Sequence, residues 1–260
     1  FVIIDNREKI INLTKDQIVK ICDRNFIGCD QLIFIEPDSS ADANLKFFNS
    51  DGGESGACGN GTRCVANLIS NEKNNKSIIL NTLSGKLKSE ILEKKIVTTE
   101  IGKAKLKWDE IPLSKEMDTK NLNIKIIDTN NNEHLGGTAI NVGNPHIVFF
   151  VKRIEDFNIE KIGPEIENHE IFPEKCNVSI AQIFNKNLIK VKVWERGAGL
   201  TKACGTAACA TAYAGKLNNL TENKTDIEFA TGKLSISIDE NDSIHMKGPV
   251  SNIKEINIKL

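Results

Sequence analysis

The sequence predicts an α+β protein built from a duplicated unit. Short runs rich in β-branched residues, separated by Gly, Asn, Asp and Ser, occupy most of the 260 residues and indicate strands joined by turns. Only a few segments have the spacing of a helix. One loop-and-helix segment of the first half also recurs in the second half, which is typical of a duplicated fold.

The expected strands are short runs rich in β-branched residues, some of which alternate with polar residues. The run Leu234–Ile238 alternates Leu and Ile with Ser, which is the pattern of a strand with one buried face. The first residues, Phe1–Asp5, also have a strand pattern. Further strand segments are Gln31–Glu36, Ile78–Leu92 with a turn at Ser84-Gly85, Asn123–Asp128, Ala139–Val142, Ile147–Val151, Leu188–Trp194 and Ile227–Met246, the last broken at Thr231-Gly232 and at Glu240–Asp242.

The first two of the four expected helices are Thr14–Cys22 and Glu155–His169. Thr14–Cys22 opens with Thr14 and Gln17 at the spacing of a capping box. Glu155–His169 is expected to be helical with an interruption at Gly163-Pro164, because proline removes a backbone donor.

The other two expected helices, Gly59–Ile69 and Gly205–Lys216, each follow a Gly-rich loop. The second consists almost wholly of Ala, Cys, Thr and Gly through Ala214. A helix that is small and apolar on every side is normally enclosed on every side, so we expect it in a core.

Composition narrows the class of protein. The 34 Lys and Arg against 35 Asp and Glu leave a net charge of −1, which gives no electrostatic reason to expect nucleic acid or an anionic membrane as partner. No run approaches the roughly 18 apolar residues of a membrane span, and no signal peptide opens the chain.

Seven irregularly spaced cysteines do not form a secreted disulfide scaffold, so a reducing cytoplasm is expected. Because the first residue is not Met, we expect further residues upstream.

The internal repeat places residues 48–59 over residues 194–205 without a gap. Phe48 lies over Trp194, Gly53 over Gly199, and Ala-Cys-Gly over Ala-Cys-Gly. In both copies a strand precedes the loop and a small-residue helix follows the cysteine. We therefore expect one copy of the unit in each half.

The repeat singles out Cys58 and Cys204, each at the point where a Gly-rich turn enters a helix. Free N–H groups and the positive dipole end stabilise an anion there, and can lower a thiol pKa from near 8.5 to roughly 3.5–7.5. Two such thiols on opposite sides of one cleft could invert a stereocentre, one removing a proton and the other returning it. The amides that could hold a substrate carboxylate are those of Gly59, Asn60, Gly205 and Thr206.

Other interpretations of the cysteines stay open. A disulfide between Cys58 and Cys204, or a nucleophilic cysteine paired with His146, is an alternative to proton transfer. A metal site is not indicated, because there is no Cys-x-x-Cys and the four histidines are scattered. The remaining cysteines are expected to pack as small apolar side chains: Cys22, Cys29, Cys64, Cys176 and Cys209.

Five motifs in order resemble those of diaminopimelate epimerases. They are Phe48–Glu54, Ala57–Cys64, Gly143–His146, Glu195–Gly197 and Ala203–Thr206. The similarity runs from Phe1–Asp5 and Ile27–Gln31 to Gly248-Pro249, and so covers nearly the whole chain.

The resemblance implies two pseudo-symmetric domains, each a curled, mostly antiparallel sheet around a central helix, with the active site in the cleft between them. The first would comprise residues 1–117 with about 250–260 and carry Cys58; the second would comprise residues 118–249 and carry Cys204. The implied enzyme is a cofactor-independent isomerase that interconverts LL- and meso-2,6-diaminopimelate in lysine and peptidoglycan precursor biosynthesis. Family members are usually homodimers.

By matching positions, Cys58 and Cys204 would be the catalytic acid/base pair, with His146 beside the site and no metal. The implied substrate-binding residues are Gln31, Asn49, Gly59, Asn60, Asn144, Asn177, Glu195, Arg196, Gly205 and Thr206. A guanidinium suits a carboxylate and a carboxylate suits an ammonium, which fits a substrate with two amino-acid ends.

The sequence departs from the family pattern in three places. The Gly-Asn-Asp segment expected ahead of Phe1 is not in the sequence, Ala57 stands where Met is commoner, and Ala207 stands where Gly is commoner. Two other functions are alternatives. Proline and hydroxyproline racemases typically carry His at the position of Asn60, and a non-catalytic binding protein of the same fold would not need both cysteines.

Overall fold

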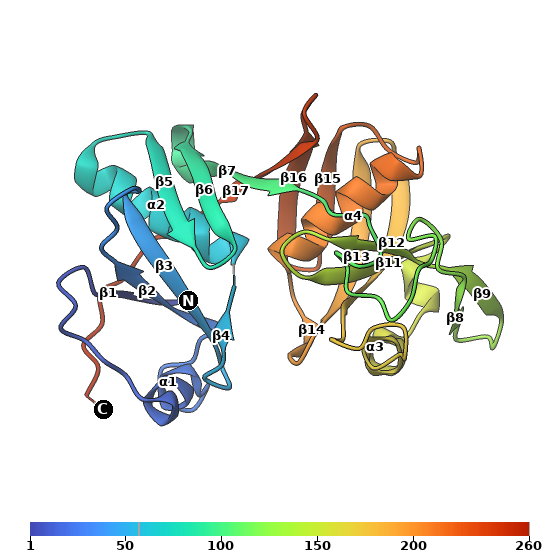
Figure 1. Ribbon diagram of the computed structural model, residues 1–260, viewed down its shortest axis with the longest axis horizontal. Helices are drawn as coiled ribbons and strands as arrows, with labels where there is room; N and C mark the ends of the chain where they lie inside the picture. Colours follow the sequence, from blue (N-terminus) through green and yellow to red (C-terminus); the bar gives the residue numbers. More distant parts are fainter. Residues whose placement is uncertain (57, 260) are drawn as a thin grey trace. The chain divides into compact units, whose positions relative to one another are not determined.

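The computed structural model describes residues 1–56 and 58–259 and divides into two compact units (Figure 1). Unit 1 comprises Phe1–Glu100 and Lys247–Leu260, and unit 2 comprises Ile101–Met246. Ala57, one of the departures from the family pattern, and Leu260 lie outside the described residues.

Unit 1 is a mixed sheet with the strand order β1-β2-β3-β5-β6-β7. The pairs β1/β2 and β3/β5 are parallel, whereas β2/β3, β5/β6 and β6/β7 are antiparallel. Its elements are β1 Val2–Asp5, α1 Lys15–Cys22, β2 Gln31–Glu36, β3 Ala43–Asn49, β4 Glu54–Ser55, α2 Gly59–Lys73, β5 Ser77–Thr82, β6 Gly85–Ile91, a 3-10 turn Glu93–Lys95 and β7 Ile96–Lys103, which continues into unit 2.

Unit 2 repeats this arrangement with the strand order β16-β15-β13-β12-β11-β10. The pairs β11/β12 and β13/β15 are parallel, and β12/β13 and β15/β16 are antiparallel. Its elements are β8 Ile124–Ile127, β9 Glu133–Gly136, β10 Thr138–Asn141, β11 Pro145–Val151, a 3-10 turn Ile154–Asp156, α3 Ile159–Glu167, β12 Asn177–Asn185, β13 Leu188–Glu195, β14 Gly199–Thr201, α4 Gly205–Leu217, β15 Lys224–Phe229, β16 Gly232–Ile238 and β17 Ser243–Pro249, which continues into unit 1.

The strand pairs around the two cysteine-bearing loops agree with the expected repeat. Phe48 pairs with Glu54 between β3 and β4, and Trp194 pairs with Leu200 between β13 and β14. Both pairs are related by the same shift that relates Cys58 to Cys204. The two halves therefore share one fold and one register around the cysteine-bearing loops.

The helix α4 is enclosed by its own sheet, as its composition predicts. Nearly every residue from Gly205 to Gly215 is buried, and the helix contacts β10, β11, β12, β13, β15 and β16 (Figure 1, orange). The Ala and Gly side chains let the strands approach the helix backbone on all of its faces. Its N-terminus, which carries Cys204, is thus held by a rigid core.

Two other helices differ in length from the sequence prediction. The helix after Cys58, α2, extends beyond Ile69 and ends where Asn74 adopts a left-handed conformation with φ of 51°. The predicted helix Glu155–His169 is wrong at both ends: α3 starts at Ile159, where Asn158 caps the Glu160 amide, and ends at Glu167. The expected interruption at Gly163-Pro164 is also wrong, because α3 runs through Pro164. The capping box of α1, formed by Thr14 and Gln17, is confirmed.

The compact units divide the chain after residue 100, whereas the sequence analysis placed the first boundary after residue 117. The intervening residues belong to the packing of unit 2, where Ile101 and Leu106 contact one apolar cluster and Ile111 and Leu113 are buried in another. The halves defined by the repeat remain a prediction. None of the described helices is long and apolar enough to span a membrane.

Two hairpins of unit 2 share one turn sequence, Asp-x-Asn-x-x-x-His. Asp128 accepts hydrogen bonds from the backbone amides of Asn130 and Asn132 and contacts His134 Nε2 at 3.0 Å. Asp239 does the same with the amides of Asn241 and Ser243 and with His245 Nε2 at 3.1 Å. These side-chain and backbone donors hold the pKa of both carboxyls below the usual range.

We expect Asp128→Asn and Asp239→Asn to lower the melting temperature near pH 7, and the deficit to shrink as the pH falls below about 4. A carboxyl whose pKa is lower in the folded than in the unfolded state stabilises the fold above its unfolded pKa. That contribution is lost as the pH falls through the folded pKa. Calorimetry between pH 2.5 and 7 measures the difference. The exposed Asp109→Asn is the matched control, and a deficit that is independent of pH would contradict the expectation.

Candidate active site

Cys58 is the N-cap residue of α2. Its backbone is extended, with φ of −146° and ψ of 99°, and its Sγ accepts a hydrogen bond from the Gly61 amide at 3.3 Å. A Cβ at Gly61 would lie 2.5 Å from Ile33 Cδ1, so glycine lets the first turn of α2 press against β2. The thiol is therefore half-buried at a helix start that donates to it.

Cys204 is the N-cap residue of α4 and is buried, with 6% of its surface exposed. Burial, and after it the carboxylate of Glu195, raise the pKa of the Cys204 thiol well above its usual range. The Thr206 hydroxyl, 3.4 Å from Sγ, and the Ala207 amide act in the opposite direction. The sequence analysis expected a helix start to lower the pKa of Cys204. In the structure the pKa is raised, because burial and the negative charge of Glu195 outweigh the helix amides.

Replacing Glu195 with Gln is expected to lower the pKa of Cys204, because the substitution removes the negative charge that opposes the thiolate. The rate of iodoacetamide alkylation at Cys204, followed against pH by peptide mass spectrometry, reports the thiolate fraction. Glu170→Gln makes the same charge change at an exposed position. If the pH at which the alkylation rate is half-maximal were the same in the two variants, the expectation would be contradicted.

Asn177 lies at the start of β12 and is 2% exposed. Its Nδ2 donates to the Pro145 carbonyl at 3.0 Å, and its Oδ1 accepts from the Arg196 amide at 3.0 Å. Its amide group therefore ties the first residue of β11 to the turn after β13. In this structure both ends of the Asn177 side chain are engaged with backbone.

Asn144 and His146 form the neighbouring pair. His146 Nε2 lies 2.8 Å from Asn144 Oδ1, so Nε2 carries the proton that Asn144 accepts. His146 is fully buried, and its Nδ1 has no hydrogen-bond partner within residues 1–56 and 58–259. Burial, together with the charge of Arg196, lowers its pKa to about 3. At neutral pH, His146 is therefore an uncharged side chain that orients Asn144.

Glu195 and Arg196 bring opposite charges to the end of β13. The Thr201 hydroxyl donates to Glu195 Oε1, and Arg196 Nη1 donates to the Glu174 carbonyl at 2.9 Å. Glu195 also acts on Cys204, as the raised pKa of that thiol shows. An ammonium and a carboxylate of one ligand would complement these two side chains.

In unit 1, Gln31 and Asn49 lie opposite one another across β2 and β3, and Gln31 Nε2 donates to Asn49 Oδ1 at 2.8 Å. Asn60, in the first turn of α2, accepts from Arg63 Nη2 at 3.0 Å. Gln31 begins β2 as Asn177 begins β12, at equivalent positions of the repeat. Each unit therefore places an amide side chain at the start of the same strand.

The predicted site residues thus form two groups, one in each unit. The group in unit 1 contains Gln31, Asn49, Cys58, Gly59 and Asn60. The group in unit 2 contains Asn144, His146, Asn177, Glu195, Arg196, Cys204, Gly205 and Thr206.

Comparison with known proteins identifies the family. Residues 1–107 and 138–253 match the family model described as diaminopimelate epimerase. A diaminopimelate epimerase of Pelagibacter ubique (strain HTCC1062) is 68% identical over 260 residues, which are 100% of this chain and 95% of that protein. The chain belongs to the diaminopimelate epimerase family.

Solved structures outside the diaminopimelate epimerases share the fold. A phenazine biosynthesis protein of the PhzF family from Bacillus anthracis superposes with a TM-score of 0.65 at 14% identity, covering 99% of this chain and 92% of that one. A hydroxyproline epimerase from Agrobacterium vitis, solved with trans-4-hydroxy-L-proline, gives 0.64 at 13% identity, covering 89% and 75%. At such identities the likeness shows the architecture.

Sequence reasoning about this diaminopimelate epimerase family member missed Thr201, which holds Glu195 through its hydroxyl. The signal was available in the repeat, where Thr201 lies over Ser55. Both residues stand in the short strand that precedes a cysteine-bearing helix. In unit 2 this hydroxyl contacts Glu195, at the end of β13.

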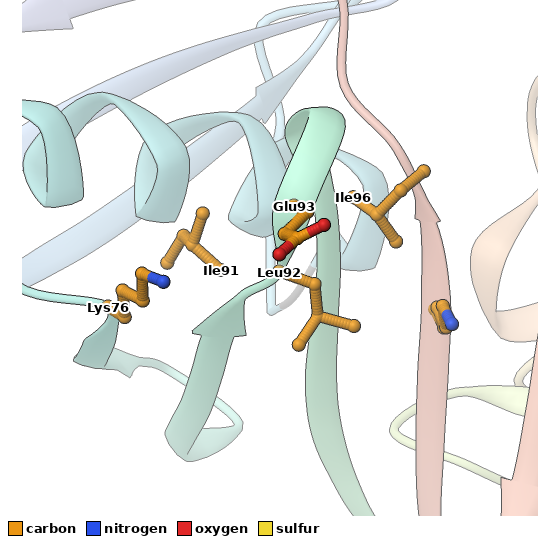
Figure 2. Close-up of a pocket in the computed structure, with 6 residues that line it drawn as sticks. Lys76, Ile91, Leu92, Glu93 and Ile96 are labelled. Carbon is orange, nitrogen blue, oxygen red and sulfur yellow. The ribbon is translucent and has the colours of Figure 1, made fainter.

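A surface hollow of about 450 Å³ lies in unit 1 (Figure 2). It is lined by Lys76, Ile91, Leu92, Glu93, Ile96 and Lys247. None of the predicted site residues lines it. Among the described residues, there is also no cluster of three His, Cys, Asp or Glu side chains that could hold a metal ion.

Proposed function

We propose that the chain interconverts LL-2,6-diaminopimelate and meso-2,6-diaminopimelate by proton transfer at one α-carbon. The observation that carries this proposal is the pair of cysteines at the N-caps of two equivalent helices, in a member of the diaminopimelate epimerase family. Each helix start offers backbone amides to an anion, and each offers one thiol. The reaction needs these two features together.

Cys58 and Cys204 form the acid/base pair. A thiolate removes the α-proton from one face, while a thiol delivers its proton to the other face. Because the pKa of Cys204 is raised, Cys204 rests as the thiol. In one direction of the reaction, Cys58 is then the base that removes the α-proton, and Cys204 delivers its proton to the opposite face. The roles are exchanged in the reverse direction.

The negative charge that develops at the α-carbon spreads onto the attached carboxylate. Backbone amides at the two helix starts stabilise that charge as preorganised donors, an arrangement that supplies a large part of many rate enhancements. The residues assigned to this role are Gly59, Asn60, Gly205 and Thr206.

The distal amino-acid end of the substrate is bound by side chains of both charges. Arg196 binds the carboxylate, and Glu195 binds the ammonium as well as controlling Cys204. The other assigned contacts are Gln31, Asn49, Asn144 and Asn177, with His146 orienting Asn144. We further propose that the enzyme is a cytoplasmic homodimer that acts in lysine biosynthesis.

Proton NMR of LL-diaminopimelate in D2O with the reduced protein tests the function. The chain is assayed as given and with the family's Gly-Asn-Asp segment added before Phe1. Loss of the α-proton signal together with meso product supports the proposal. Exchange with proline and none with diaminopimelate would favour a racemase, which shares the fold of the hydroxyproline epimerase from Agrobacterium vitis. No reaction with either substrate would favour a binding protein.

A further inference from the structure

Helix α3 contains a glycine where a neighbouring ring leaves no room for a side chain. A Cβ at Gly163 would lie 2.3 Å from Trp194 Cγ, inside the contact distance of real atoms. The helix packs beside β13 and β14 (Figure 1). The Trp194 indole is the nearest side chain to both Gly163 and Gly199. Gly163 therefore marks a close approach between this helix and the end of β13.

One turn further along the same face, α3 ends in a buried carboxylate. Glu167 is 6% exposed. Its Oε2 accepts from Trp194 Nε1 at 2.7 Å, and its Oε1 accepts from the Gly197 amide at 3.0 Å. Each carboxylate oxygen thus has its own N–H donor, as a buried charge requires.

The two donors flank the charged residues of the candidate site. Trp194 and Gly197 are the residues immediately before and after Glu195-Arg196. The Glu167 carboxylate therefore holds both ends of the segment that carries these two side chains. Asn177 fixes the middle of the same segment through the Arg196 amide.

We propose that Glu167 is a positioning residue that fixes the Trp194–Gly197 turn, and thereby sets how tightly Glu195 and Arg196 bind the distal end of the substrate. The inference rests on the proposed function for the identity of the ligand. The contact itself lies wholly within unit 2. A side chain that orients a binding segment acts on substrate affinity more than on the proton-transfer step.

Glu167→Gln tests the proposal, because the amide keeps the shape but leaves only one oxygen for two donors. We expect KM for LL-diaminopimelate to rise roughly tenfold and kcat to change by less than about threefold. The indole N–H resonance of Trp194 is expected to move upfield, and exchange of the Gly197 amide to accelerate. Trp108→Phe assigns the indole signal, since the chain has two tryptophans. The exposed Glu165→Gln on the same helix is the matched control and is expected to change none of these.

Two results would overturn the proposal. One is an unmoved indole signal. The other is an unchanged KM; if the amount of active enzyme and the melting temperature fall at the same time, Glu167 acts in folding alone. If Glu167→Gln does not fold, Trp194→Phe removes one donor and keeps a ring against Gly163; it must then raise KM without lowering kcat, and an unchanged KM overturns the proposal. A wild-type protein that neither binds nor turns over diaminopimelate refutes the proposed function. The indole and Gly197 measurements then decide the carboxylate contact independently.

Discussion

Cys58→Ala and Cys204→Ala are each expected to lower kcat for epimerisation by about 10²–10⁴-fold, the usual contribution of a positioned acid or base. Inversion needs a proton taken from one face of the α-carbon and a proton given to the other. A protein that retains one thiol can serve one face only. Turnover of LL-diaminopimelate, followed by NMR or a coupled assay, measures the loss.

The same variants separate proton exchange from inversion. Each remaining thiol is expected to exchange the α-proton of one isomer with D2O, so that one variant exchanges the LL isomer and the other exchanges the D centre of the meso isomer. Cys64→Ala and Cys209→Ala, on the same two helices, are the matched controls and are expected to stay active. Near-normal epimerisation by either Cys58→Ala or Cys204→Ala would rule out the two-base scheme.

The local part of the site could be predicted from the sequence because it depends on short-range rules. A Gly-rich turn followed by a run of small residues gives a helix start, and the repeat shows that the start occurs twice. The structure places Cys58 and Cys204 at the two N-caps, as the sequence analysis expected. The enclosure of α4 also follows from composition alone, since only a surrounded helix can be small and apolar on every face.

The electrostatic part could not be predicted in this way, because it depends on residues distant in the sequence. The helix start suggests a lowered pKa at Cys204, but burial and the Glu195 carboxylate raise it. Glu167 shows the same limit. Its hydrogen bonds join the end of α3 to a turn about thirty residues later, and no periodicity or spacing connects these segments. Tertiary contacts decide the charge state and the orientation of groups that local sequence can only place on an element.

Arg196→Lys is expected to lower kcat/KM for diaminopimelate by about 10–150-fold, mainly through KM, which corresponds to about 1.5–3 kcal/mol for hydrogen bonds to a charged group. The guanidinium already gives Nη1 to the Glu174 carbonyl. A lysine has one compact ammonium, so it cannot keep that contact and present a planar donor pair to a carboxylate. Steady-state kinetics measure the effect. Arg153→Lys, at a residue whose side chain is 69% exposed, is the control and is expected to leave kcat/KM unchanged.

A substrate without the distal carboxylate tests the proposed role of Arg196. L-Lysine is LL-diaminopimelate without the distal carboxylate. It therefore lacks the group that Arg196 is proposed to bind, and any slow exchange of its α-proton does not depend on that contact. If Arg196 acts on that carboxylate, Arg196→Lys reduces exchange on diaminopimelate and leaves the slow exchange on L-lysine almost unchanged, which is the coupling that a double-mutant cycle measures. An equal loss on both substrates would mean that Arg196 acts through the Asn177 and His146 network instead. The affinity of the distal end would then have to come from Glu195 and the amide side chains.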